Sequence, residues 1–276
     1  MKIQKLLPVA IAAISIFAAV TAQAGVVVTI DPQAQNGLGA AGVVDATEAA
    51  FNTDGFVGSL GSVLTIFGTT AGPALYSESG RISVSDWQLG NANLNTNVAS
   101  TYKIYADFLL TGVGGWSAGG AVPGGSFAAS PVGNVLSFSL GADTNNDGLV
   151  DIALGTGGLD STDPTVAFSF LFAGNRALTS FSATVLFTPE PGTVGVGGFF
   201  RAPSPFSIDI AAGNVGGTTN DTTYAINGNV VTITTVGGSG NFDFVNHVPE
   251  PTSLALIGVA LAGAGFATRR KERAQV

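Results

Sequence analysis

The sequence predicts an all-β fold in which most of the chain forms an antiparallel β-sandwich-like domain. Short segments alternate apolar residues with Ser and Thr, which places one face of a strand in a core and the other in water. Glycine is abundant, with 39 in 276 residues, and only 10% of the residues are charged. This composition is typical of short strands joined by tight turns. Between the two ends of the chain, no segment of useful length has a helical period.

Strands are expected where the alternation is strongest, at 81–87, 136–140, 166–170, 179–185 and 230–234. Asn227-Gly228 precedes the last of these runs and is a typical signal for a two-residue hairpin turn. Gly-rich stretches at 112–125 and 192–198 are expected to be loops. The β-rich ectodomain, 25–246, is large for one sandwich, so two packed sub-domains remain an alternative.

Residues 25–248 are strongly acidic. They contain 16 Asp and Glu against four cations, Arg81, Lys103, Arg176 and Arg201, so their net charge is −12. So few cations cannot release many phosphate counterions, which argues against nucleic-acid binding. The chain also has no Cys, which excludes disulfide bonds, a thiol nucleophile and a thiolate metal site.

The amino end, 1–24, has the three parts of a secretory signal peptide. A basic start is followed by an apolar run at 6–20 and a small-residue site, Ala22-Gln23-Ala24, before Gly25. Cleavage is expected after Ala24. The alternative, a permanent anchor, fits less well because the apolar run is short and ends in a good cleavage site.

The carboxyl end, 247–276, is predicted to hold a single transmembrane helix. Pro249-Glu250-Pro251 precedes an apolar run of 14 residues, 254–267. The run is shorter than the roughly 20 residues that span a bilayer comfortably. Cations that resist translocation follow it, so the basic end should stay in the cytoplasm; they are Arg269, Arg270, Lys271 and Arg273. The alternative is a buried amphipathic helix with a solvated basic end.

In order and position, these features resemble the PEP-CTERM sorting signal. The resemblance implies that Pro249, Glu250 and Pro251 are the motif recognised by exosortase, a membrane enzyme that removes the tail. It also implies export, transient anchoring in the membrane, and delivery to the outer surface or extracellular matrix. A second Pro-Glu-Pro at 189–191 lacks both the apolar helix and the basic end, and is expected to be a turn.

The segment 143–151 has the spacing of a calcium loop. Its expected ligands are Asp143, Asn145, Asp147, the carbonyl of Leu149, and Asp151, direct or through water. Gly148 permits the sharp reversal that such loops need, but Leu154 replaces the usual bidentate Glu. The strand-like flanks make the loop similar to calcium loops in β-hairpins, such as FG-GAP-type repeats. The alternative is a turn without an ion, because the same residues favour turns.

A looser resemblance covers much of the middle, at 102–108, 174–188, 199–200, 203–206 and 212–214. These segments, in this order before the tail, are similar to flocculation-associated PEP-CTERM proteins, which help cells aggregate within a polysaccharide matrix. The resemblance implies exopolysaccharide or other matrix components as partners. Aromatic residues are expected either in the core or stacked on sugars; they are Trp87, Tyr102, Tyr105 and Trp116.

No catalytic constellation stands out. The only His is His247, beside the sorting motif, where a triad would be hard to position. Zinc sites need several His or Cys ligands, and the Gly-rich runs lack a phosphate-binding ending. The sequence therefore favours a structural or adhesive matrix protein that is not an enzyme. A carbohydrate-binding module and a glycan hydrolase remain alternatives, since carboxylate pairs are invisible in sequence.

Overall fold

The computed structural model describes residues 26–34, 43–161, 166–173, 176–193, 195, 197–201, 206–213 and 222–245. This part of the chain forms strands and contains no helix. The strands are β1 (Val28–Ile30), β2 (Phe51–Thr53), β3 (Gly55–Phe67), β4 (Gly72–Leu89), β5 (Ala92–Asn93), β6 (Lys103–Trp116), β7 (Ser126–Ala129), β8 (Val135–Asp143), β9 (Ile152–Leu159), β10 (Val166–Ala173), β11 (Arg176–Pro189), β12 (Phe200–Arg201), β13 (Phe206–Gly213), β14 (Thr222–Asn227) and β15 (Val230–Val245).

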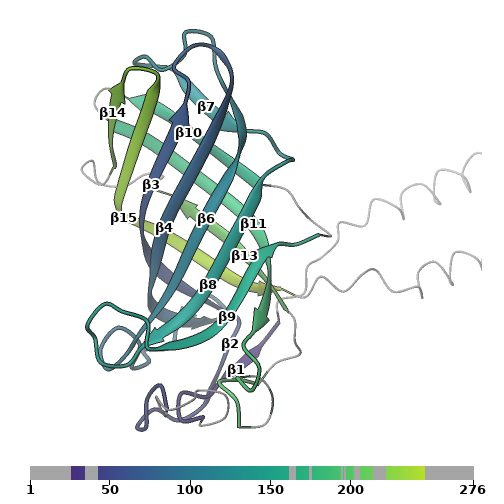
Figure 1. Ribbon diagram of the computed structural model, residues 1–276. Helices are drawn as coiled ribbons and strands as arrows, with labels where there is room; N and C mark the ends of the chain where they lie inside the picture. The colour runs from purple at the N-terminus through teal and green to yellow at the C-terminus, as the bar shows by residue number, and fades with distance from the viewer. Residues whose placement is uncertain are drawn as a thin grey trace, which may run out of the picture. The chain divides into compact units, whose positions relative to one another are not determined.

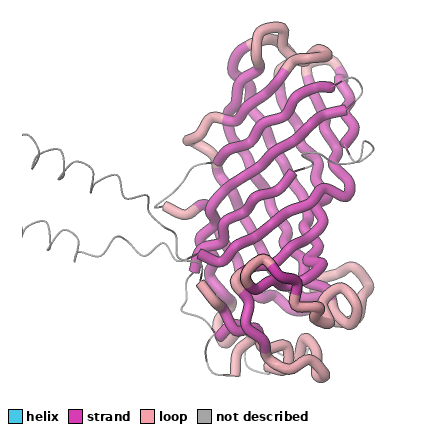
Figure 2. The backbone as a smooth tube through the Cα atoms, turned by 180° about the vertical axis from the view of Figure 1, so that it is seen from behind, coloured by secondary structure: helices cyan, strands magenta, loops and turns pink. Residues whose placement is uncertain are grey.

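Eight strands close into an antiparallel barrel (Figure 1). Around its lower part, the end near β1 and β2 in the figure, the order is β3-β4-β6-β8-β9-β11-β13-β15 and back to β3. The ring is complete because β15 pairs with β3 and β4 pairs with β6. Figure 2 shows the same wall of strands from behind, with loops gathered at its two ends.

Other strands complete the upper part of the wall. β6 pairs with β8 at 103–111 and with β7 at 114–116. β11 likewise pairs with β9 at 185–189 and with β10 at 176–183. β14 pairs with β15 and meets β11 at one register position, Arg176 opposite Thr223. The long strands therefore run through both levels of the barrel.

The barrel corrects the prediction of a sandwich. The all-β class and the alternating strands are confirmed, but hydrogen bonding runs around a closed ring instead of dividing into two facing sheets. The difference has a physical reason. Side chains alternate in and out along a strand in both architectures, so the period of the sequence does not distinguish them.

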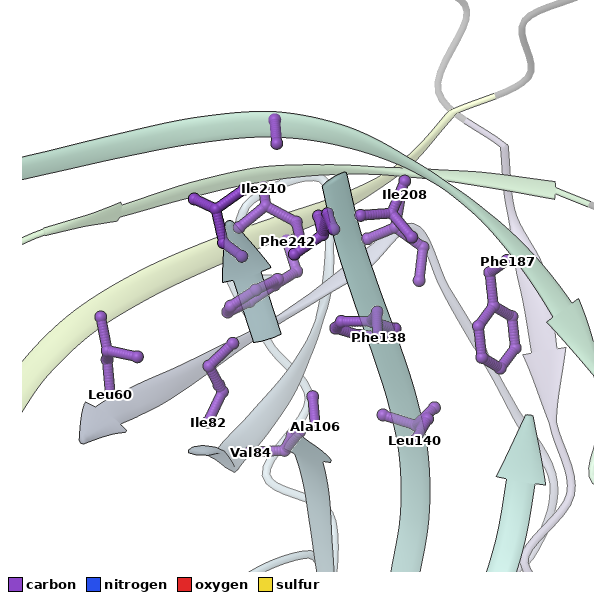
Figure 3. Packing of buried hydrophobic residues seen from close by; sticks show 14 of the residues in the cluster. Leu60, Ile82, Val84, Ala106, Phe138, Leu140, Phe187, Ile208, Ile210 and Phe242 are labelled. Atoms are coloured by element: carbon purple, nitrogen blue, oxygen red, sulfur yellow. The ribbon is translucent and has the colours of Figure 1, made fainter. Parts of the chain in front are cut away.

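The interior of the barrel is filled with apolar side chains (Figure 3). Phe138, Ile208 and Phe242 reach it from three different strands. Phe56 stacks on Phe242 with ring centroids 4.5 Å apart. The outer positions between them carry Ser, Thr, some aliphatic residues and a few charged residues such as Arg81 and Asp107. Burial of the inner row is the main term that holds the fold together, since the chain has no disulfides.

Glycine inside strands makes room for aromatic rings. A Cβ on Gly114 of β6 would collide with the ring of Phe127, and one on Gly155 of β9 would collide with the ring of Phe187. This explains why the stretch at 112–125, expected to be a loop, is strand as far as Trp116. Its remainder lies between β6 and β7, where Gly119, Gly120 and Gly124 have positive φ.

The predicted turns are confirmed with small shifts. The hairpin between β14 and β15 turns at Gly228 and Asn229, one residue later than expected, because Asn227 pairs with Val230. At 189–191, the second Pro-Glu-Pro ends β11 and enters a turn, as expected.

A small sheet of order β12-β1-β2 lies at the lower end of the barrel. An ion pair between Arg201 and Asp31 joins two of its segments. The N–H of Val26 donates to the carbonyl of Phe244 at 2.9 Å. The first and last described segments of this unit therefore lie side by side.

Candidate functional site

The loop between β8 and β9 holds the predicted metal ligands, and Asp143 is its buried centre. Asp143 ends β8 with no exposed surface. Its Oδ1 accepts from the N–H groups of Asn145 and Asp147 at 3.2 and 3.3 Å, and its Oδ2 from that of Gly148 at 2.9 Å. Burial acts to raise the pKa of Asp143, but these backbone hydrogen bonds outweigh it and lower the pKa below the ordinary value.

The other oxygen ligands are engaged within the same loop. The side-chain oxygen of Asn145 accepts from the N–H of Asp147 at 2.9 Å, and Asp147 accepts from Leu149 at 2.8 Å. Asp151 Oδ2 accepts from the N–H and hydroxyl of Thr144, both at 2.8 Å. Gly148 has a φ of 88°, which confirms the predicted reversal.

Arg81 ties this loop to the barrel wall. Its guanidinium forms a two-pronged ion pair with Asp107, at 2.6 and 2.8 Å, between neighbouring strands β4 and β6. A third nitrogen donates to the carbonyl of Gly148 at 2.8 Å, and the group lies 4.5 Å from the centroid of the Tyr105 ring. The hydrogen bond to Asp107 raises the pKa of Arg81. Loop, β4 and β6 are thereby fastened together.

Within the described residues, no three Asp, Glu, His or Cys side chains converge to hold a metal ion. Asp143 points to backbone N–H groups, while Asp151 bonds to Thr144. The structure places the predicted ligands in one loop and leaves calcium binding a prediction.

Calcium binding predicts that millimolar calcium raises the melting temperature of the protein and that magnesium does so less, because the oxygen ligands suit the larger ion. Asp147→Ala removes one ligand and should abolish the shift. Thermal unfolding with calcium, magnesium or a chelator measures both effects. An unchanged melting temperature at millimolar calcium would mean that the loop is a turn without an ion.

A buried acid inside the barrel was missed by the sequence reasoning. Glu78 of β4 is 6% exposed and lines a cavity of about 20 Å³ with room for one water molecule. The rest of the lining is apolar; it consists of Leu60, Ile82, Phe108, Leu136, Phe138, Phe181 and Ile210. Burial raises the pKa of Glu78 to about 7, against a smaller lowering by a hydrogen bond with Ser62. The sequence does contain a signal that could have revealed Glu78. It stands in step with Tyr76, Ile82 and Val84 in the alternation of β4, and these three side chains face the barrel interior.

The four singled-out aromatic residues belong to the core. Trp87 and Tyr102 have no exposed surface, and Tyr105 and Trp116 are 6% and 5% exposed. Trp116 donates from its ring nitrogen to the carbonyl of Gly68 at 2.8 Å. These side chains do not form an exposed platform on which a sugar could stack, so the core alternative is confirmed.

The two targeting segments lie outside the described residues. These are the predicted signal peptide with Ala22, Ala24 and Gly25, and the tail that follows Asn246. A search of the described residues for a membrane-crossing helix finds none, and the predicted helix at 254–267 is not among them.

Comparison with known proteins gives one match. Residues 247–271 match the family model of the PEP-CTERM protein-sorting motif. No curated protein and no solved structure matches the chain. The match spans the predicted recognition residues Pro249, Glu250 and Pro251 and identifies the sorting segment. The chain thus carries a PEP-CTERM sorting motif, and it is an exported protein that exosortase processes on its way to the cell surface.

Proposed function

We propose that the protein is a structural or adhesive component of the cell surface or extracellular matrix, associated with exopolysaccharide in flocculation or biofilm formation. The observation that carries the proposal is the sorting motif at 247–271, which directs the protein toward the cell surface. The tail anchors the protein in the membrane transiently, and the processed barrel then stays at the surface or enters the matrix.

The barrel supports a role that needs no enzyme chemistry. Its interior is packed, and the cavity beside Glu78 has room for one water molecule, so a sugar ring has no place there. Closure of the barrel leaves no unpaired strand edge around its ring, which suits a module that works outside the cell. Its acidic surface suits neutral or cationic matrix components.

The test is to replace Pro249, Glu250 and Pro251 with Ala in the chromosomal gene. The chain should then be exported but remain unprocessed, leaving a larger form in the membrane fraction, and floc formation should fall to the level of a deletion strain. Cell fractionation with immunoblotting and a settling assay measure these outcomes.

The chain supplies its own matched control, because Glu190 lies in a second Pro-Glu-Pro that has no helix behind it. Glu190→Ala should leave processing and settling unchanged. The proposal fails if the triple-Ala protein is correctly located and aggregates cells as the native protein does. If it is mislocated but settling is unaffected, sorting stands and the adhesive role falls.

A further inference from the structure

The outer face of the upper barrel carries no charged side chain over several adjacent strands. The segments 55–77, 108–142 and 222–242 contain no Asp, Glu, Lys, Arg or His. They supply all of β3, the upper part of β6, and most of β15. In β4 the one acid of the upper part, Glu78, points into the barrel. The ion pair of Arg81 with Asp107 marks the lower border of this face.

Two rows of side chains define this face, here called the uncharged face. The register aligns Phe67, Leu75 and Val113 across β3, β4 and β6 as one apolar row. The next row below it is Thr65, Ser77 and Thr111. In Figure 1 the three strands run as neighbours along the barrel wall.

The side chains of the apolar row point to solvent, whereas the neighbouring residues along each strand point into the barrel core. Phe67, Leu75 and Val113 are 52%, 60% and 42% exposed. Directly opposed side chains on adjacent strands lie about 5 Å apart, so the three form one contiguous strip. Single exposed apolar residues are ordinary, but an aligned strip without charge is typical of a contact surface.

We infer that the uncharged face is where two copies of this chain associate, the face of one copy against the same face of another. The net negative charge of the barrel is the argument for this contact surface between copies. Residues 25–248 carry a net charge of −12, so copies repel one another wherever acids face each other. The uncharged face is a surface on which two such copies meet without opposing like charges. A two-fold contact uses the same patch on both sides, so one face is sufficient.

The size of the face sets the strength of the association. Strands lie about 4.8 Å apart and alternate residues about 6.7 Å apart, so two rows over three strands cover about 200 Å². A stable interface needs about 800 Å² from each partner. The pair is therefore weak in dilute solution and forms where copies are crowded. This inference concerns the barrel alone and does not depend on the proposed adhesive role.

Disulfide cross-linking in the exporting cells tests the inference on the full chain. Because the chain has no Cys, any disulfide-linked dimer must come from an introduced thiol. Ser77→Cys and Thr111→Cys place the thiol on the uncharged face. Ser59→Cys and Ser85→Cys place it at exposed positions lower on β3 and β4. Each variant carries one thiol. After mild oxidation, Ser77→Cys and Thr111→Cys should each give a dimer band on a non-reducing gel, and Ser59→Cys and Ser85→Cys should each give about tenfold less dimer.

Adding Leu75→Asp to Ser77→Cys puts like charges into the contact and should reduce the dimer about tenfold. Ser59→Asp added to Ser77→Cys is the matched control and should leave it unchanged. Resistance to protease confirms that each variant is folded.

The inference is overturned if the control thiols at positions 59 and 85 give as much dimer as the thiols at positions 77 and 111. It is also overturned if Leu75→Asp does not change the dimer yield of Ser77→Cys. It is also overturned if the thiol of Ser77→Cys is shielded from maleimide but gives no dimer. That result would assign the face to a matrix polysaccharide or another protein.

Discussion

Acidifying the protein from about pH 8 to about pH 5 is expected to raise its free energy of unfolding by about 2.5 kcal/mol, through Glu78 alone. Burial raises the pKa of Glu78 from 4.5 to about 7 in the folded protein. The folded state therefore binds this proton more tightly than the unfolded state does. Its stabilising effect is complete below pH 4.5 and is lost as the pH rises through 7.

The surroundings of Glu78 explain the size of the effect. No cation contributes to its pKa, and its cavity is otherwise lined by apolar side chains. Its negative charge also contributes to the raised pKa of Tyr76, about 12, of which burial is the larger cause. An ionised carboxylate in this position has only the hydrogen bond with Ser62 to replace its hydration.

Glu78→Gln should remove this pH dependence, because the amide fills the same space and does not ionise. Urea unfolding at several pH values measures the slope. Glu190→Gln, which neutralises an acid in a turn outside the barrel interior, is the control and should keep the native slope. All three proteins share His247, so its contribution cancels. A native slope in Glu78→Gln would show that another group is responsible.

Much of the fold follows from the sequence, and the part that does not has a definite cause. Alternation located segments of β4, β8, β10, β11 and β15. It missed that β4 extends from Gly72 to Leu89, because Ser77-Glu78-Ser79-Gly80 resembles a polar break. Barrel closure depends on pairing between Leu64 and Ile233, far apart in the chain. No local pattern encodes such a partner.

The candidate sites also divide into those that the sequence alone predicts and those that depend on contacts between distant strands. The sorting motif is linear and is read by a membrane enzyme, so three residues and their flanks sufficed to find it. The loop at 143–151 was also found, but its partners Arg81 and Tyr105 come from β4 and β6 and needed the structure. Glu78 was hidden for the same reason. Its burial depends on the closure of strands around it.

Asp143→Ala is expected to cost about 3 kcal/mol of stability in the absence of calcium. The substitution leaves the N–H groups of Asn145 and Gly148 without their acceptor, while the N–H of Asp147 keeps only the side-chain oxygen of Asn145. Hydrogen bonds to a charged group contribute about 1.5–3 kcal/mol each, though such contributions overlap when one group makes several. Because the pKa of Asp143 is lowered in the folded protein, its contribution is present above pH 3.8 and is lost as the pH falls through its folded value.

Asp151→Ala is the matched comparison, because it removes an acid from the other end of the same loop. Asp151 accepts only from Thr144, at exposed positions, and its loss should cost about 0.5–1 kcal/mol. Urea unfolding in the presence of a chelator measures both variants without a bound ion.

The ratio of the stability losses of Asp143→Ala and Asp151→Ala distinguishes two roles of the loop, a hydrogen-bonded structural link and a calcium site. If it is a hydrogen-bonded clasp centred on Asp143 and fastened by Arg81, Asp143→Ala costs several times more than Asp151→Ala, and calcium does not change the ratio. If it is a calcium site, adding the ion stabilises the native chain and each variant loses that extra stability, so the two losses become more similar. A small loss for Asp143→Ala in the chelator would contradict the clasp, because a buried carboxylate with three backbone donors cannot be removed at little cost.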